Sequence, residues 1–497
     1  MKQEIMAEGE GPQRSTVIPI RRLIALILGP ATMLGLLIFP VPENLSPEAW
    51  NLVTVSAWMM IWWMTEAVPV PVTALLPIPL MPLLHISEQK AVSANYGDPL
   101  IFLFLGGFLI AAAMQRWGLH ERIALHIVKM MGTGPESIIA GFMLATAFLS
   151  MWISNTATTV MMYAVGISII EFLSGHLDDQ ANVRRFGIAL LLGVAYSASI
   201  GGVGTLIGTP PNALLASFLS ANYAIEIGFG TWMQMGIPLV IIMLPLTWLL
   251  LCKGIFSVRD VKLGGVAGLI EKKLKALGPM SKGERIVLVV FVCTVFFWIC
   301  KKWVVALTGL PITDTSITLM SAILLFAWPA SVERGHFTIE WASVKNVPWG
   351  VLLLFGGGLA LASAFKSTGL AADIGRLVGD MGTVNIALVV LATISLVIFL
   401  TEITSNTATT ATFLPILGGI AVGLGLNPMV LVVPATLAAS MAFMMPVATA
   451  PNAIVFAYEE MHIADMMKAG FWLNLITIGL VYAAMFILAP IVLGITL

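Results

Sequence analysis

The chain has 497 residues, of which 59% are hydrophobic and only 10% charged, and its formal net charge is −1. Soluble domains carry about 25% charged residues, so this composition excludes an ordinary soluble protein. The small net charge and the lack of a basic tail in the sequence give no indication of nucleic-acid binding. Many apolar runs of about 20 residues instead predict an all-α, multi-pass protein of the lipid bilayer.

The apolar runs predict about 11 transmembrane helices and two further hairpins. The first run, Leu23–Phe39, is expected to be a retained span rather than a signal peptide, because no small-residue cleavage site follows it. Prolines between 69 and 82 predict that the third span is irregular. In chain order, the spans are predicted at 23–40, 48–64, 67–84, 98–116, 186–220, 232–252, 286–307, 312–330, 348–366, 428–458 and 467–495, and the hairpins at 137–174 and 384–424.

The distribution of Lys and Arg among the connecting segments predicts the orientation of the chain. With the N-terminus inside, 20 of the 25 Lys and Arg residues fall in inner segments and 5 in outer segments. This bias agrees with the positive-inside rule. We therefore expect a cytoplasmic N-terminus, an extracytoplasmic C-terminus, and one hairpin entering from each side. The polar linker at 253–285 is expected to be a cytoplasmic connector without a regulatory role.

The string Ser-Asn-Thr-Ala-Thr-Thr occurs at 154–159 and again 251 residues later, at 405–410. Two glycine-containing pairs, at 106–107 and 118–119, recur at the same spacing, and Thr-x-Pro-Asn-Ala recurs 240 residues apart. Combined with the charge-derived orientation, the repeats would run through the membrane in opposite directions. This pattern predicts an inverted repeat, which is a common plan of secondary transporters.

Each Ser-Asn-Thr trio follows an apolar run of helix length, and residues that favour helices resume after it. An ordinary helix-turn-helix, whose Ser or Asn caps the second helix, would explain one such trio. It does not explain the same six residues twice in apolar surroundings, so we interpret both trios as binding tips at membrane depth. The last carbonyls of the first half-helix could coordinate a cation, and the N–H groups and positive dipole end of the second could bind an anion.

The tips carry side-chain ligands of two kinds, amides and hydroxyls. In chain order these are Ser150, Ser154, Asn155 and Thr156 in the first half, and Thr401, Ser405, Asn406 and Thr407 in the second. The first residue of each set stands four positions before its serine, so the two hydroxyls are expected to share a helix face. Oxygen ligands of this kind suit a hard cation such as sodium.

Thr-x-Pro-Asn-Ala, at 209–213 and 449–453, is the second repeated element. Proline breaks the helix ladder but suits the first turn of a new helix. A helix broken at membrane depth is tolerated where it lines a cavity. A simple kink would explain the prolines alone, whereas the repeated Thr and Asn favour a site.

Other polar residues are assigned ordinary roles. Glu402 could carry a proton, but the matched position in the first hairpin is Met151, which favours a structural role. Glu66 and the histidines fall near predicted span ends and are expected to be interfacial; the histidines are His85, His120, His126, His176, His336 and His462. The predicted midplane contains no Arg or Lys and no symmetric carboxylate pair, which favours cation coupling over proton coupling. The three cysteines predict neither a disulfide framework nor a metal site.

The paired Ser-Asn-Thr tips, the hydroxyl four residues before each, the two Thr-x-Pro-Asn-Ala strings and the segment Thr-Glu-Ala-Val-Pro-Val-Pro at 65–71 resemble the divalent anion/sodium symporter family. The resemblance covers nearly the whole chain. It implies a homodimer in which each protomer moves a transport domain against a scaffold domain by an elevator mechanism. The implied divisions are a cytoplasmic N-terminus at 1–22, scaffold helices at 23–97 and 286–347, repeats at 98–252 and 348–497 that contain the hairpins, and the linker at 253–285.

The resemblance also implies a set of site residues. One sodium site would use Ser150, Ser154, Asn155 and a carbonyl near Gly204, and the other would use Thr401, Ser405, Asn406 and a carbonyl near Ala448. Substrate carboxylates would meet the six residues Ser154, Asn155, Thr156, Ser405, Asn406 and Thr407, together with Thr209 and Thr449.

We predict a secondary transporter of the plasma (inner) membrane that couples sodium to the uptake of C4-dicarboxylates such as succinate, malate and fumarate. It is not expected to be an enzyme or to need an organic cofactor. The first alternative is a sodium-independent dicarboxylate or citrate exchanger, or a sulfate transporter. An intramembrane enzyme is less favoured, because the sequence shows no nucleophile–base or metal-binding motif. A passive channel is disfavoured because the sequence shows no open polar pore stripe.

Overall fold

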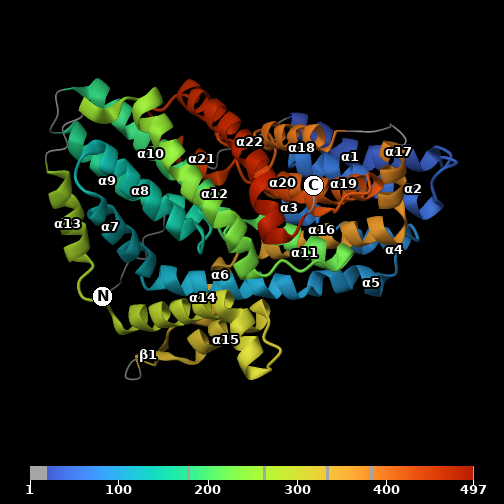
Figure 1. Cartoon of the computed structure of the whole chain (residues 1–497), viewed down its shortest axis with the longest axis horizontal. Helices are drawn as coiled ribbons and strands as arrows, with labels where there is room; N and C mark the ends of the chain where they lie inside the picture. Colours follow the sequence, from blue (N-terminus) through green and yellow to red (C-terminus); the bar gives the residue numbers. More distant parts are fainter. Residues whose placement is uncertain (1–19, 176–178, 261–264, 332–334, 380–384, 496–497) are drawn as a thin grey trace, which may run out of the picture.

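The computed structural model describes residues 20–175, 179–260, 265–331, 335–379 and 385–495, and within them the chain is almost entirely α-helical (Figure 1). Some features predicted from the sequence lie outside these residues. They are the N-terminal segment up to residue 19, His176, part of the linker at 261–264 and residue 384 at the start of the second hairpin.

The first quarter of the chain forms helices of unequal length. They are α1 (Ile20–Ile38), α2 (Pro47–Thr65), α3 (Val70–Thr73), α4 (Pro77–Leu83), α5 (Gln89–Ala94), the 3₁₀ turn η1 (Asn95–Gly97), α6 (Pro99–Arg116) and α7 (Leu119–Met131). The third predicted span is irregular as expected, because prolines divide it into the short helices α3 and α4. Asp98 begins α6 by accepting a hydrogen bond from the Leu100 N–H (2.9 Å).

The first predicted hairpin is a pair of helices that meet at the Ser-Asn-Thr tip. The pair and the helices after it are α8 (Pro135–Ser150), α9 (Asn155–Ser174), α10 (Gln180–Gly202), α11 (Pro210–Tyr223), α12 (Phe229–Leu249), the π-helical turn η2 (Leu250–Ile255), the 3₁₀ turn η3 (Val258–Asp260) and α13 (Val266–Ala276). The predicted break at the first Thr-x-Pro-Asn-Ala string is confirmed, because seven residues separate the end of α10 from the start of α11 at Pro210. The predicted span at 186–220 is therefore two helices.

A long apolar helix, a shorter apolar helix and a small β-hairpin follow the linker. The elements are α14 (Lys282–Thr308), α15 (Asp314–Ala327), β1 (Pro329–Ser331), β2 (His336–Phe337), the 3₁₀ turn η4 (Trp341–Asn346), α16 (Trp349–Ser367) and α17 (Leu370–Gly379). The strands β1 and β2 pair antiparallel. They were not predicted, since two and three residues are too few to show an alternating pattern.

The second hairpin repeats the local arrangement of the first. The remaining helices are α18 (Ile386–Thr401), α19 (Asn406–Gly423), α20 (Met429–Ala439), α21 (Ala450–Val455) and α22 (Ile463–Leu493). The predicted span at 428–458 is divided into α20 and α21, again at the Thr-x-Pro-Asn-Ala string. Both hairpins therefore have their break at Ser-Asn-Thr, and both following helices have theirs at the proline string.

In each half of the chain, the short helix that follows the proline break packs against helices of the other half. The helix α11 of the first half packs against α16, α19 and α20 of the second half. In return, α21 packs against α9 and α10, and Figure 1 shows it beside them while α11 lies beside α16. This exchange brings each proline string next to the hairpin of the opposite half, and it positions the site described below.

Within the described residues, seven helical stretches are long and apolar enough to cross a membrane, by length and composition. The helices α8 and α18 have 16 residues each, which gives them a length of about 24 Å, shorter than a bilayer core of about 30 Å. The short helices α7, α13 and α17 were not predicted. α7 and α17 begin at the leucines of the repeated Gly-Leu pairs, and Gly118 and Gly369 allow the sharp turn before each helix with positive φ values of 71° and 79°.

Candidate functional site

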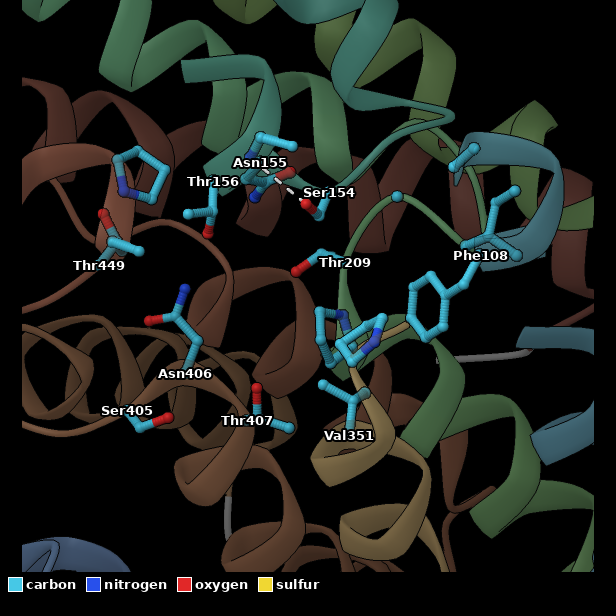
Figure 2. Close-up of a pocket in the computed structure, with 18 of the residues that line it drawn as sticks. Phe108, Ser154, Asn155, Thr156, Thr209, Val351, Ser405, Asn406, Thr407 and Thr449 are labelled. Atoms are coloured by element: carbon cyan, nitrogen blue, oxygen red, sulfur yellow. Dashed lines mark hydrogen bonds between the residues drawn. The ribbon is translucent and has the colours of Figure 1, made fainter. Parts of the chain in front are cut away.

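The two Ser-Asn-Thr tips face each other across one cavity with a volume of about 870 Å³ (Figure 2). Ser154, Asn155 and Thr156 approach from one side, and Ser405, Asn406 and Thr407 from the other. The cavity is also lined by residues from both proline strings and from three other segments; these include Glu66, Phe108, Gln115, Arg116, Ile207, Gly208, Thr209, Ser343, Val351, Val447, Ala448 and Thr449.

The first tip is formed where α8 ends and α9 begins. Ser154 has non-helical backbone angles (φ −56°, ψ 141°) and caps α9: its hydroxyl accepts a hydrogen bond from the Ala157 N–H (3.3 Å). Ser150 is fully buried, and its hydroxyl donates to the Ala198 carbonyl of α10 (2.7 Å). Of its two possible orientations, the Asn155 amide makes more hydrogen bonds in the one whose NH₂ group faces its neighbours. In that orientation the NH₂ group donates to Ser150 Oγ (2.5 Å), Ala198 O (3.2 Å) and Gly208 O (3.2 Å). Asn155 therefore connects the tip to α8, α10 and the loop before α11.

The loop between α10 and α11 closes on this tip. The Thr205 hydroxyl donates to the Met151 carbonyl (2.5 Å). This bond gives a partner to one of the carbonyls that lack an intrahelical partner at the end of α8. Asn212 Nδ2 donates to the Thr205 carbonyl (2.8 Å) and holds the loop from the side of α11. At Gly202, an added Cβ would lie 2.8 Å from the end of the Asn155 side-chain amide and 3.1 Å from the Gly208 carbonyl oxygen, so glycine allows this close approach.

An aromatic cluster fixes the turn at the first tip. The Trp152 ring meets Phe291 edge-on at 5.1 Å between centroids and lies parallel to Phe229 and Trp298 at 6.3 and 6.4 Å. These contacts tie the tip to α12 and α14. The matched residue of the second tip, Ile403, is 67% exposed, so the two tips are packed differently.

The second tip has related hydrogen bonds but a different cap. The Thr401 hydroxyl donates to Asn406 Oδ1 (2.7 Å) and also reaches the Ala439 carbonyl (3.0 Å). Ser405 precedes α19 without a side-chain capping bond. In the nearby proline string, Thr449 caps α21 by accepting a hydrogen bond from the Asn452 N–H (3.2 Å).

The expectation that Ser150 shares a helix face with Ser154, and Thr401 with Ser405, is wrong. α8 ends at Ser150 and α18 at Thr401, and each serine belongs to the cap of the next helix. The spacing rule of four residues holds only inside a continuous helix. The buried hydroxyls instead contact their own Asn and the neighbouring helix.

All eight residues predicted to meet the substrate line the cavity: Ser154, Asn155, Thr156, Thr209, Ser405, Asn406, Thr407 and Thr449. Ser150 and Thr401 are fully buried behind them. Ala448 also lines the cavity, but Gly204 does not, and Gly208 stands at the place equivalent to Ala448. The sequence contained this signal, because the spacing of 240 that aligns the proline strings also aligns 208 with 448.

Several lining residues were not predicted. Phe108 and Val351 supply apolar surface beside the tips (Figure 2). Arg116, the last residue of α6, is the one basic side chain on the described cavity lining, and its Nη2 donates to Glu340 Oε1 (2.6 Å). The hydrogen bond from Arg116, together with one involving His336, lowers the pKa of Glu340. No sequence pattern connects α6 with residue 340, which is 224 positions away.

The site is suited to small anions and hard cations. The N-termini of α9 and α19, helices of 20 and 18 residues, present free N–H groups and positive dipole ends at the cavity. Hydroxyl, amide and carbonyl oxygens of the tips and loops provide hard ligands beside them. In the described part of the chain, no group of three or more His, Cys, Asp or Glu side chains could hold a metal ion.

Comparison with known proteins identifies the family. Residues 20–494 match the family described as the sodium:sulfate symporter transmembrane region. The chain belongs to the divalent anion/sodium symporter family. It is 42% identical over 484 residues to the "Sodium-dependent dicarboxylate transporter SdcS" of Staphylococcus saprophyticus, with 96% of this chain and 93% of the relative covered. It is 43% identical to the protein of the same name from Staphylococcus aureus, with 95% and 92% covered.

Two solved structures share the fold of this symporter-family chain at low identity. The Alcanivorax borkumensis YdaH transporter superimposes with a TM-score of 0.58 at 13% identity and covers 90% of this chain and 99% of its own. MtrF of Neisseria gonorrhoeae gives 0.58 at 11% identity and covers 95% of each chain. The family, the fold and the apolar helices together establish a multi-pass membrane protein of a transporter family.

Proposed function

We propose that the protein is a secondary transporter that couples sodium to the uptake of C4-dicarboxylates such as succinate, malate and fumarate. The observation that carries the proposal is the meeting of both Ser-Asn-Thr tips in one cavity. Each tip provides a helix N-terminus for one carboxylate, so two tips suit an anion with two carboxylates. The names of the relatives with 42% and 43% identity support the substrate class and the coupling ion.

The proposed sodium sites use oxygens behind each tip. The first uses Ser150, Ser154 and Asn155, and we assign its carbonyl ligand to Gly208 instead of Gly204. The second uses Thr401, Ser405, Asn406 and the Ala448 carbonyl. The support for Gly208 is its place on the cavity lining and its closeness to Asn155. In the proposed site the amide of Asn155 turns its oxygen toward the ion in place of the NH₂ group. The tips themselves carry no positively charged side chain. Sodium bound at these places would add positive charge beside the substrate carboxylates.

The proposed plan is an inverted repeat that works as a homodimer by an elevator movement. Its support is the repeated order of hairpin and broken helix, together with the exchange of α11 and α21 between the halves. The N-terminus is proposed to be cytoplasmic. Glu66, Arg116 and Ser343, which line the cavity, come from segments that the charge count assigns to that side. The described conformation then has its cavity open toward the cytoplasm.

A transport assay tests the proposal directly. Purified protein in proteoliposomes should accumulate radiolabelled succinate in a sodium gradient, and replacing sodium by choline should reduce the initial rate by about 50-fold or more. Competition by malate, fumarate, citrate and sulfate ranks the anions. Unchanged succinate uptake in choline would refute sodium coupling and favour an exchanger. Strong competition by sulfate alone would favour a sulfate transporter, which the description of the family also allows.

Arg116 leads to a separate prediction about anion capture. Its guanidinium has donors beyond the one that pairs with Glu340, and it lines the cavity near the proposed cytoplasmic opening. Arg116→Gln is expected to raise the cytoplasmic succinate concentration for half-maximal efflux about threefold at low salt, and less at high salt because of screening. Lys345→Gln is the control, because Lys345 is an exposed basic residue two positions from Ser343 that does not line the cavity. Equal effects of the two changes would exclude a specific role for Arg116.

A further inference from the structure

Glu402, the residue that follows Thr401, has a side chain in an unusual environment. Its side chain is buried, with 4% of the residue exposed. Oε1 accepts hydrogen bonds from the Phe443 N–H (2.7 Å) and from Asn474 Nδ2 (2.7 Å). Oε2 accepts from the N–H groups of Met444 (2.9 Å) and Met445 (3.1 Å). The carboxylate therefore binds the middle of the loop between α20 and α21 and one side chain of α22.

These partners indicate an ionised carboxylate. Three of the four are backbone N–H groups, which can only donate, and they engage both oxygens. Within the described residues, no Lys or Arg forms an ion pair with Glu402. A buried charge that is hydrogen-bonded but not paired still lacks a countercharge. A cation bound close to Glu402 would supply it.

The loop held by Glu402 is the one that carries the Ala448 carbonyl. The Met445 N–H donates to Glu402, and the Met445 carbonyl accepts from the Ala448 N–H (3.2 Å) and from Asn452 Nδ2 (3.0 Å). Glu402 thus lies one residue from Thr401 and two hydrogen bonds from Ala448. Both are proposed ligands of the second sodium site.

At the position matched to Glu402, the described part of the first half has no charged side chain. The matched residue is Met151, and the matched loop is held by neutral groups instead. The Thr205 hydroxyl donates to the Met151 carbonyl, and Trp232 Nε1 donates to the Val203 carbonyl (2.9 Å). The two half-sites therefore have similar oxygen ligands but different net charge in their surroundings.

We propose that Glu402 is a fixed countercharge that makes the second sodium site tighter than the first, so that this site fills first. The inference rests on the proposed sodium coupling and adds an order and a residue to it. Glu402 acts through the loop and through its charge, without contacting sodium, and is therefore a positioning residue. A negative charge near a bound cation favours that cation most strongly where water is excluded.

The test is a sodium titration of Glu402→Gln, which keeps the size of the side chain and removes its charge. The sodium concentration for half-maximal succinate uptake should rise about tenfold, while the rate at saturating sodium stays within about threefold of the wild type. Glu402→Asp keeps the charge, and its sodium concentration for half-maximal uptake should lie between the values of the wild type and Glu402→Gln. Glu284→Gln is the matched control, because Glu284 is also a buried carboxylate but pairs with Arg122 (2.8 Å) away from the cavity.

Other outcomes separate the possible failures. If Glu402→Gln lowers the maximal rate or the melting temperature but leaves the sodium dependence unchanged, Glu402 only braces the loop and the inference is wrong. If the wild type itself shows no sodium dependence, the proposed function fails as well. Should Glu402→Gln not fold, sodium-dependent thermal stabilisation of Ser150→Ala and Thr401→Ala decides the order. The rise in melting temperature that occurs at the lowest sodium concentrations reports the tighter site. Its loss in Thr401→Ala supports the inference, and its loss in Ser150→Ala overturns it.

Discussion

Asn155→Ala and Asn406→Ala are each expected to reduce sodium-dependent succinate uptake by at least about 100-fold while leaving expression and folding intact. Both residues line the cavity at the first position of a helix. The Asn155 amide reaches Ser150 and the Gly208 carbonyl, and the Asn406 amide accepts from the Thr401 hydroxyl. Alanine removes a proposed sodium ligand and a substrate contact at once. The loss should appear in initial rates of radiolabelled uptake into proteoliposomes.

The matched control for these changes is Asn427→Ala. Asn427 also stands at the start of a helix, where its side chain accepts from the Met429 N–H (3.0 Å), but it does not line the cavity. Its removal should leave uptake within about twofold of the wild type. Near-normal uptake by either Asn155→Ala or Asn406→Ala, with protein present at wild-type levels, would contradict a site shared between the two tips.

Gly208→Ala is expected to have the second largest effect, a loss of about 50-fold in uptake with a raised sodium requirement. A Cβ at this position would lie 2.4 Å from the Gly202 carbonyl oxygen and 2.9 Å from its Cα. Backbone atoms cannot rotate away as a side chain can, so the loop between α10 and α11 must shift. Because the Gly208 carbonyl approaches Asn155, the shift would open the first proposed sodium site.

Gly479→Ala separates this steric effect from the general effect of adding a methyl group. Gly479 lies in α22, and an added Cβ there would meet no atom within 4 Å. Alanine at such a helical position should leave transport unchanged and stabilise the helix by roughly 0.5–1 kcal/mol. Thermal unfolding and uptake of both variants check the pair. Wild-type uptake by Gly208→Ala would show that the close packing of the loop on the tip is not needed.

Patterns within short stretches of sequence predicted the positions of the breaks. The hairpin ranges 137–174 and 384–424 agree with α8–α9 and α18–α19 to within a few residues. The prolines of both Thr-x-Pro-Asn-Ala strings begin new helices as expected. These features depend on local chemistry, namely hydroxyl caps, missing N–H groups and apolar runs, and local chemistry is visible in the sequence.

Contacts between distant segments were not predictable in the same way. The pairing of Arg116 with Glu340 and the place of Gly208 beside Asn155 both depend on how segments approach one another. The wrong expectation for Ser150 and Ser154 has a related cause. The four-residue rule presumes a continuous helix, and the turn at Met151–Ile153 is set by packing of Trp152 against α12 and α14.

The sequence by itself determined the class of protein, the repeated tips and the residue types at the site, because burying so many polar groups twice among apolar residues has few stable solutions. Only the tertiary structure decided that the tips share one cavity, that α11 and α21 exchange partners, and that the Gly208 carbonyl approaches the Asn155 amide. It also decided that Glu402 binds a loop while Met151 does not. Side-chain identity is local, but the distance between two half-sites 251 residues apart is set by packing of the whole chain.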